Sequence, residues 1–98
     1  MKKKENEMSD VIRNNTEQNR FELDADGHTA LALYRLAPGT ITIYHTQVDP
    51  EVEGRGIGSR LVRASLEEVR RLGLKLVPGC SFVRAYVRDH PEFNDLLP

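Results

Sequence analysis

The sequence has little of what several protein classes require. It contains one cysteine, Cys80, no tryptophan, three tyrosines and three phenylalanines. A single cysteine cannot form an internal disulfide, a usage typical of reducing compartments, so a cytoplasmic protein is expected. No apolar run approaches the roughly 18 residues of a membrane span, and the charged N-terminus lacks the apolar core of a signal peptide. We therefore expect no association with a membrane.

Metal-ligand spacings and nucleic-acid signatures are scarce as well. There is no Cys-x-x-Cys, and possible ligands do not recur in the paired spacings of metal sites, so no metal is expected. His28 and His90 are interpreted as structural, because one follows a turn and the other precedes a proline. The few aromatic residues do not alternate with the arginines. Nucleic-acid binding is therefore the weakest function considered.

The composition is that of one small globular domain, with 98 residues of which 39% are hydrophobic and 30% charged, at a net charge of -1. Residues 1–19 are polar and show no apolar period, so we expect a disordered or loosely attached tail. Residues 20–98 would then form a single domain. Its short length favours a monomer.

Three segments in the first half have the pattern of strands. Residues 20–24 alternate apolar and polar side chains, and the Asp-Gly pair at 26–27 is a strong hairpin signal before a second strand at 28–36. A proline-glycine turn at 37–39 precedes a third strand at 40–48, which is rich in β-branched residues. These segments predict an antiparallel three-strand meander.

The second half changes to a helical period. Residues 57–72 place their apolar side chains on one half of a helix, and Gly73 is the expected C-terminal cap. A short strand follows at 74–77, and Ser81 is a plausible N-cap for a second helix at 82–89. The crossover between the third and fourth strands is long enough for a parallel pair. The predicted order is β-β-β-α-β-α, an α+β fold.

A glycine-rich loop joins the meander to the first helix. Gly54, Gly56 and Gly58 alternate with single residues, which would expose backbone N–H groups at a helix N-terminus. Residues 54–88 carry eight basic side chains and two acidic ones, a local net charge of +6. Both features favour a polyanionic small ligand, although a solvated helix face explains the charge equally well.

The loop does not match two common nucleotide motifs. A P-loop needs Gly-x-x-x-x-Gly-Lys-Ser/Thr, and a dinucleotide fingerprint needs a third glycine at position 59, where Ser59 stands. The loop instead resembles the coenzyme-A signature of the GNAT superfamily of N-acetyltransferases, Gln/Arg-x-x-Gly-x-Gly/Ala. Gly56 and Gly58 match its glycines, whereas Glu53 stands at the position where Gln or Arg is usual. A carboxylate repels pyrophosphate, so backbone amides would have to carry the binding.

Further motifs extend the resemblance from about Phe21 to Leu97. The chain is similar to the short YjdJ-type family of GNAT-like proteins in these segments: His45-Thr46-x-Val48, Pro78-x-Cys80-Ser81-Phe82-Val83, Tyr86-Val87, His90-Pro91-Glu92 and Leu96-Leu97. The resemblance implies a minimal GNAT-like fold that binds acetyl-CoA and acetylates an unknown amine.

The resemblance also implies a set of binding residues. Val48 would line the pantetheine arm of acetyl-CoA. Pyrophosphate would bind the backbone amides from Arg55 to Ser59, and the side chains of Arg55 and Arg60 are candidate phosphate contacts. The complete set is Val48, Arg55, Gly56, Ile57, Gly58, Ser59 and Arg60.

Cys80 and His45 are the candidate catalytic residues. Cys80 precedes a predicted helix N-terminus and is close in sequence to Arg84 and Arg88, which favours a thiolate that accepts acetyl or a thiol that protonates the departing sulfur. A small buried apolar role is the alternative. His45 could act as general base, but strand alternation places it on the face of Ile41 and Ile43, so a packed histidine is equally expected.

Two functions remain open from the sequence. The first is an acetyl-CoA-dependent N-acetyltransferase that uses Cys80 as acyl carrier or acid. The second is a module that binds acetyl-CoA or CoA without efficient turnover, as a sensor or docking domain, because so short a chain leaves little to build an acceptor pocket.

Overall fold

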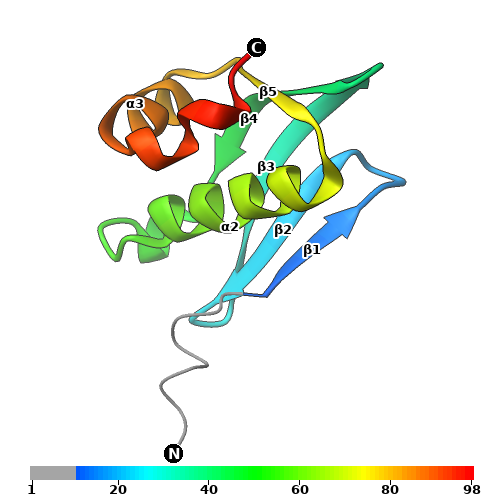
Figure 1. Cartoon of the computed structure of the whole chain (residues 1–98). Coiled ribbons are helices and arrows are strands. Elements are labelled where there is room, and N and C mark those ends of the chain that lie inside the picture. Colours follow the sequence, from blue (N-terminus) through cyan, green and yellow to red (C-terminus); the bar gives the residue numbers. More distant parts are fainter. Residues whose placement is uncertain (1–10) are drawn as a thin grey trace, which may run out of the picture.

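The computed structural model describes residues 11–98, so the first part of the expected tail lies outside the described residues. Five strands form one sheet in the order β1-β2-β3-β4-β5 (Figure 1). Strands β1 to β4 pair with one another in antiparallel order, and β5 runs parallel to β4. The elements are β1 (Ile12–Asn15), β2 (Arg20–Ala25), β3 (His28–Ala37), β4 (Thr40–Gln47), the 3-10 helix η1 (Pro50–Val52), α2 (Ile57–Leu72), β5 (Lys75–Pro78), α3 (Ser81–Asp89) and the 3-10 helix η2 (Pro91–Leu96).

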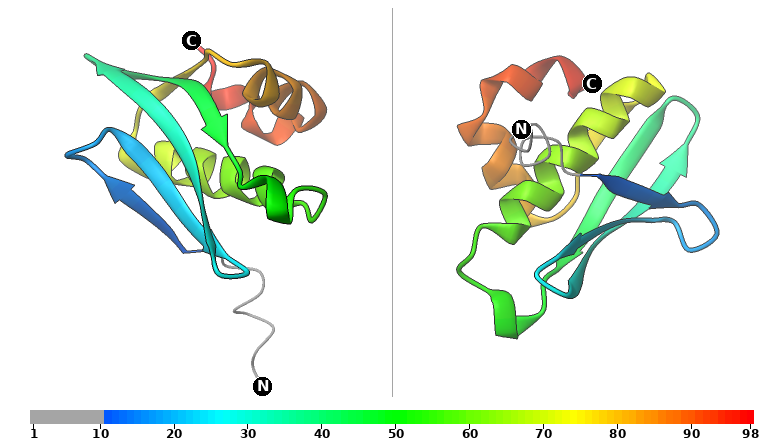
Figure 2. Two further views of the ribbon diagram at one scale, coloured as in Figure 1. Left: turned by 180° about the vertical axis from the view of Figure 1, so that it is seen from behind. Right: turned by 90° about the horizontal axis from the view of Figure 1, so that it is seen from below.

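The helices cover one face of the sheet. Helix α2 crosses that face, and α3 lies beside α2 against β4 and β5 (Figure 2). Buried side chains from the sheet, such as Ala32, Tyr34 and Ile43, meet the buried face of α2 in one apolar core. No helix within residues 11–98 is long and apolar enough to cross a membrane. The α+β class and the expected meander, crossover and second helix are confirmed.

Local sequence signals account for most element boundaries. Asp26 and Gly27 have φ values of 55° and 79°, the left-handed pair that a tight hairpin turn needs. Gly73 ends α2 with φ 75°, and its N–H donates to the carbonyls of Arg70 and Val69. The residue that caps α3 is Cys80, so the expectation of a Ser81 cap is wrong by one residue. Phe93 and Leu96, in η2, are buried.

The expected tail extends too far, because Ile12–Asn15 pair with β2 as an additional edge strand. This strand contains a single apolar residue, so the sequence shows no alternation from which to predict it. Polar contacts hold it instead. Arg13 bonds to Glu22 (Nη2–Oε1, 3.0 Å) and to Asp24, and the Asn15 side chain donates to Glu22 Oε2 (2.9 Å). Charged side chains are common on edge strands, where they discourage pairing with another chain.

Glu22 is the buried carboxylate of this edge, with 8% of its surface exposed. Hydrogen bonds from Asn15, Arg20 and Arg13 lower the pKa of Glu22 from 4.5 to about 2. The folded state therefore favours the ionised carboxylate more than the unfolded chain does. The resulting stabilisation is complete above the unfolded pKa and is lost as the pH falls through the folded one.

Replacing Glu22 should give a pH-dependent loss of stability. Glu22→Gln should lower the free energy of unfolding at neutral pH by about 2 kcal/mol, a value discounted because its partners are partly exposed. The difference in the free energy of unfolding between Glu22→Gln and the wild type should shrink as the pH falls from the unfolded pKa of 4.5 to the folded value of about 2. Urea unfolding across this range measures it, with Glu17→Gln in the exposed turn as the control. A penalty that stays constant with pH would contradict the assignment.

Candidate functional site

A cavity of about 460 Å³ lies where β4 ends, η1 and the glycine loop follow, and α3 begins. Its lining combines apolar side chains with exposed backbone, a typical composition for a small-molecule site. The lining residues are Thr46, Val48, Val52, Glu53, Gly54, Gly56, Ile57, Gly58, Ser59 and Phe82. The structure thus gathers Val48 and four of the predicted loop residues around one space.

The glycine loop presents backbone N–H groups to this cavity. Gly54 and Gly56 have φ values of 86° and 75°, a conformation that strains any residue with a Cβ. The first helical bond of α2 runs from Arg60 N–H to Gly56 O (3.1 Å). The N–H groups of Ile57, Gly58 and Ser59 precede that bond, so the helix itself gives them no acceptor. An anion placed there would gain both hydrogen bonds and the favourable end of the helix dipole.

The two arginines predicted as phosphate contacts are not among the lining residues. Arg55 is exposed, and its Nη1 donates to Asp26 Oδ2 in the β2–β3 turn (3.2 Å). Arg60 is an exposed residue of the first turn of α2. Any contact of either guanidinium group with a ligand in the cavity would require the side chain to turn toward it.

A bulge in β4 determines which side chains face the cavity. Tyr34 pairs with Ile43, but Leu33 pairs with His45, so Tyr44 is an extra residue in β4. An extra residue reverses the alternation of the strand beyond it. Thr46, opposite buried Ala32, therefore faces the helices.

The expectation that His45 shares a face with Ile41 and Ile43 is consequently wrong. Ile41 and Ile43 are 1% and 0% exposed, whereas His45 is an exposed residue on the face away from α2. The sequence reads as a regular strand through this point, and the change of face depends on one unpaired residue.

The same region is where β4 and β5 separate. Their pairing runs from Thr40↔Lys75 to Ile43↔Pro78, and the last contact is a bond from Gly79 N–H to Ile43 O (2.8 Å). Beyond this point, within residues 11–98, no strand pairs with the β5 side of β4. The backbone of β4 is thus available there to an extended ligand, as in strand-addition binding.

Cys80 lies just past this separation. It is half-buried, packs against the core and caps α3, with its carbonyl accepting the Arg84 N–H (3.0 Å). The guanidinium groups of Arg84 and Arg88 bond to Pro78 O (3.5 Å) and Asp89 (3.2 Å). Cys80 is absent from the lining of the cavity, to which its neighbour Phe82 contributes.

Phe82 lines the cavity but was not among the predicted binding residues. Its side chain is half-exposed, and its ring lies so close to Gly58 that a Cβ there would meet ring atom Cζ at 3.0 Å. Single exposed apolar residues are common on monomers, so the sequence carries no signal that selects Phe82. The glycine at position 58 allows the ring to approach the loop.

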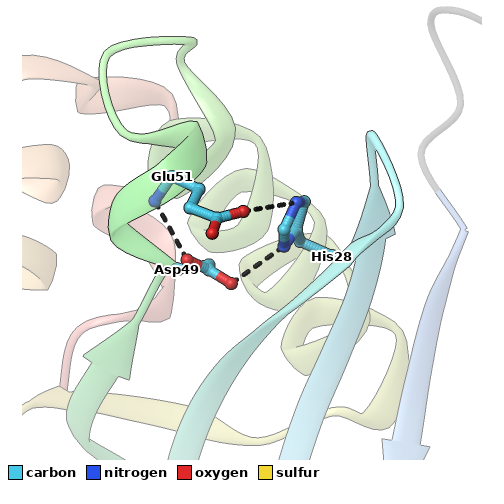
Figure 3. A group of neighbouring side chains, drawn as sticks. All are labelled: His28, Asp49 and Glu51. Carbon is cyan, nitrogen blue, oxygen red and sulfur yellow. Dashed lines mark hydrogen bonds and ion pairs between the residues drawn. The ribbon is translucent and has the colours of Figure 1, made fainter.

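A second group of polar side chains lies next to the loop. His28 Nδ1 is 2.8 Å from Asp49 Oδ2, and Nε2 is 3.7 Å from Glu51 Oε1 (Figure 3). These three residues offer possible metal-ligand atoms within 4.8 Å of one another. Motif spacing does not detect the group, since its members come from two separate segments. The carboxylates face opposite ring nitrogens, however, so they hold the imidazole from both sides and do not converge on one ligand nitrogen.

Gly79 gives a direct test of the strand separation. A Cβ at position 79 would meet Thr42 Cγ2 at 2.9 Å, Ile43 O at 3.0 Å and Tyr44 Cα at 3.3 Å, two of which are backbone atoms. Gly79→Ala should therefore push β5 away from β4 and destabilise the fold by about 1–3 kcal/mol. Thermal and urea unfolding measure the loss.

Gly58→Ala is the matched control. Its added methyl group meets only the end of the movable Phe82 ring, and alanine favours the helix, so its stability should be unchanged or slightly higher. Equal effects of the two substitutions would show that the β4–β5 contact is not the tight point described here.

Comparisons with known proteins agree with this architecture. An NMR solution structure of a GCN5-like candidate N-acetyltransferase from Staphylococcus aureus superposes with a TM-score of 0.68 and 28% identity, covering 92% of this chain and 89% of that one. Protein NATD1 from Xenopus tropicalis is 26% identical over 83 residues, which are 82% of this chain and 76% of that protein. The GNAT-like fold is confirmed, whereas the YjdJ-type subdivision stays a prediction. The family model for GCN5-related N-acetyl-transferase matches residues 20–96, and the chain therefore belongs to that family.

Proposed function

We propose that the protein is an acetyl-CoA-dependent N-acetyltransferase, acting as a cytoplasmic monomer on an amine that the structure does not identify. Family membership supports acetyl transfer in general. The observation that carries the cofactor assignment is the cavity, which joins the free N–H groups of the glycine loop to the unpaired end of β4. A long ligand with an anionic group at one end and an amide-bearing arm at the other fits this combination.

The described residues fit coenzyme A part by part. The backbone amides of Arg55, Gly56, Ile57, Gly58 and Ser59 would bind the pyrophosphate, supported by the helix dipole. Val48 would line the pantetheine arm, whose amides can pair with the free edge of β4. Arg55 and Arg60 would turn to meet phosphates at the rim. When bound, acetyl-CoA supplies an acetyl group activated as a thioester.

The position of Cys80, just after the point where β4 and β5 separate, supports a role in the transfer. As acyl carrier, Cys80 would form a thioester to the acetyl carbon while the bond from that carbon to the coenzyme-A sulfur breaks, and the thiol proton of Cys80 would pass to that departing sulfur. The amine would then attack, release the Cys80 thiolate and lose a proton. As general acid, the Cys80 thiol would instead protonate the leaving sulfur during direct attack by the amine.

His45 has a more restricted role under this proposal. Its side chain lies on the face of the sheet opposite the glycine-loop cavity. It can serve as general base only for an amine that enters the β4–β5 gap from that open face. The acceptor and the acetyl donor would then approach from opposite sides of the sheet.

A CoA-binding module without turnover is the second candidate. One observation favours it: of the residues that line the cavity, Glu53 alone has an acidic or basic side chain. Proton transfer to or from bound groups would have to come from residues outside the lining, such as Cys80.

Intact-protein mass spectrometry after mixing with acetyl-CoA separates these possibilities. The acyl-carrier route predicts one added acetyl group on the wild type and none on Cys80→Ala, because the acceptor sulfur is gone. Chemical-shift changes at residues 55–59 and Val48 without an adduct indicate direct transfer or a binding module. If CoA perturbs none of these residues, the cofactor assignment fails.

Glu53→Gln should strengthen CoA binding. Glu53 lines the cavity beside the N–H groups, so its carboxylate would repel a bound pyrophosphate. Removing the charge should lower the Kd for CoA about two- to fivefold at low salt, with a smaller gain at high salt. Calorimetric titration at two salt concentrations measures this, with Glu17→Gln, in an exposed turn outside the lining, as the comparison. A Kd that rises in Glu53→Gln would mean that Glu53 accepts a hydrogen bond from the ligand.

A further inference from the structure

The tight turn between β2 and β3 contacts the segment that leads from β4 into the glycine loop. His28, the first residue of β3, lies between Asp49 and Glu51, which flank the start of η1 (Figure 3). On the other side of the same turn, Asp26 accepts a hydrogen bond from Arg55 (3.2 Å). One turn therefore contacts both ends of residues 49–55.

Residues 49–55 make few other contacts with the rest of the chain. Val52 is 3% exposed and anchors it in the core, but residues 53–56 are all exposed. Two of these four residues are glycines at positive φ, which lose the most conformational freedom on being ordered. If no other contacts held the loop, part of the binding free energy of a ligand would be lost in ordering it into one conformation.

Asp49 connects His28 to the loop backbone. Its Oδ1 accepts the N–H of Glu51 (2.9 Å), which fixes the start of η1, while its Oδ2 contacts His28 (2.8 Å). The bond from the Glu51 backbone and the one from His28 lower the pKa of Asp49, so the carboxylate stays ionised at neutral pH. Both oxygens are thus engaged, and a shift of the His28 ring is transmitted to the first residues of the loop.

We propose that His28 is a positioning residue for the anion-binding loop, holding residues 49–55 through Asp49 and Glu51 so that the N–H groups of α2 are ready for the ligand. The inference rests on the proposed binding of CoA by that loop. His28 touches neither the cavity lining nor the reacting atoms, and it acts by reducing the ordering that binding requires. Arg55–Asp26 is a second attachment of the same kind, but it is unsuitable for the test because freeing Arg55 also changes a candidate phosphate contact.

The test compares three variants for CoA affinity and for hydrogen exchange of the loop amides. His28→Ala removes both contacts and should weaken CoA binding roughly three- to tenfold, as expected for a partly exposed charged network. His28→Gln can still donate to Asp49 and should recover part of the loss. His90→Ala is the matched control, because His90 is also half-buried and its ring contacts Tyr86, through a hydrogen bond to Tyr86 O (2.8 Å) and by stacking, away from the loop.

Hydrogen exchange supplies a readout that needs no ligand. In His28→Ala the amides of residues 53–59 should exchange faster than in the wild type, while those of the α2 interior and the melting temperature stay near the wild-type values. In a kinetic assay the KM for acetyl-CoA should rise with little change in kcat. If His28→Ala unfolds the chain, CoA affinity and loop exchange are compared in His28→Gln and Glu51→Gln instead.

Three results would overturn the proposal. One is a His28→Ala variant with the same CoA affinity and loop exchange as His90→Ala. Another is uniform acceleration of exchange over the whole chain, which would indicate a purely structural role. The third is a wild-type affinity that EDTA lowers and Zn²⁺ restores, since the group would then be a metal site. A wild type that binds no CoA refutes the proposed function, and the exchange comparison still decides whether His28 holds the loop.

Discussion

The contact between Gly79 N–H and Ile43 O, at 2.8 Å, is the constraint on which the site depends. It is the last bond between β4 and β5, and the bulge at Tyr44 begins immediately after it. Absence of a side chain at Gly79 lets the two backbones approach this closely. The separation of the strands beyond it frees one edge of β4 and brings Cys80 to the gap, and the bulge turns Thr46 toward the helices.

The sequence predicts those parts of the fold that local rules govern. The helical period and Gly73 give α2 its bounds, and the Asp-Gly pair gives the β2–β3 turn, because each depends on residues within a few positions. The glycine loop is predictable for the same reason, since its alternating glycines are needed for positive φ at Gly54 and Gly56. The order of strands and α-helices from β2 to α3 followed from these signals, and a family resemblance supplied the expected ligand.

The sequence could not reveal features that arise from pairing between distant segments. The face of His45 depends on a register shift against β3, and nothing in the residues 40–48 marks where the extra residue falls. The edge strand β1 is held by Glu22 and Tyr34 from later strands, so its own polar sequence reads as a tail. The His28 group and the contact of Phe82 with Gly58 likewise join segments that only the folded chain brings together.

Ion pairs also reduce the attraction that the positive charge after the glycine loop can exert on a ligand. Most of the arginines that create it bond to acidic partners, and these pairs are Arg55–Asp26, Arg63–Glu67, Arg70–Asp95, Arg71–Glu68 and Arg88–Asp89. Exposed pairs of this kind are largely compensated and screened by salt, so they attract a distant anion weakly. The backbone N–H groups at the start of α2 have no such internal partner in the helix. The proposed anion recognition would therefore rest on the conformation of the loop more than on its charge, which is why contacts that hold residues 49–55 would matter to it.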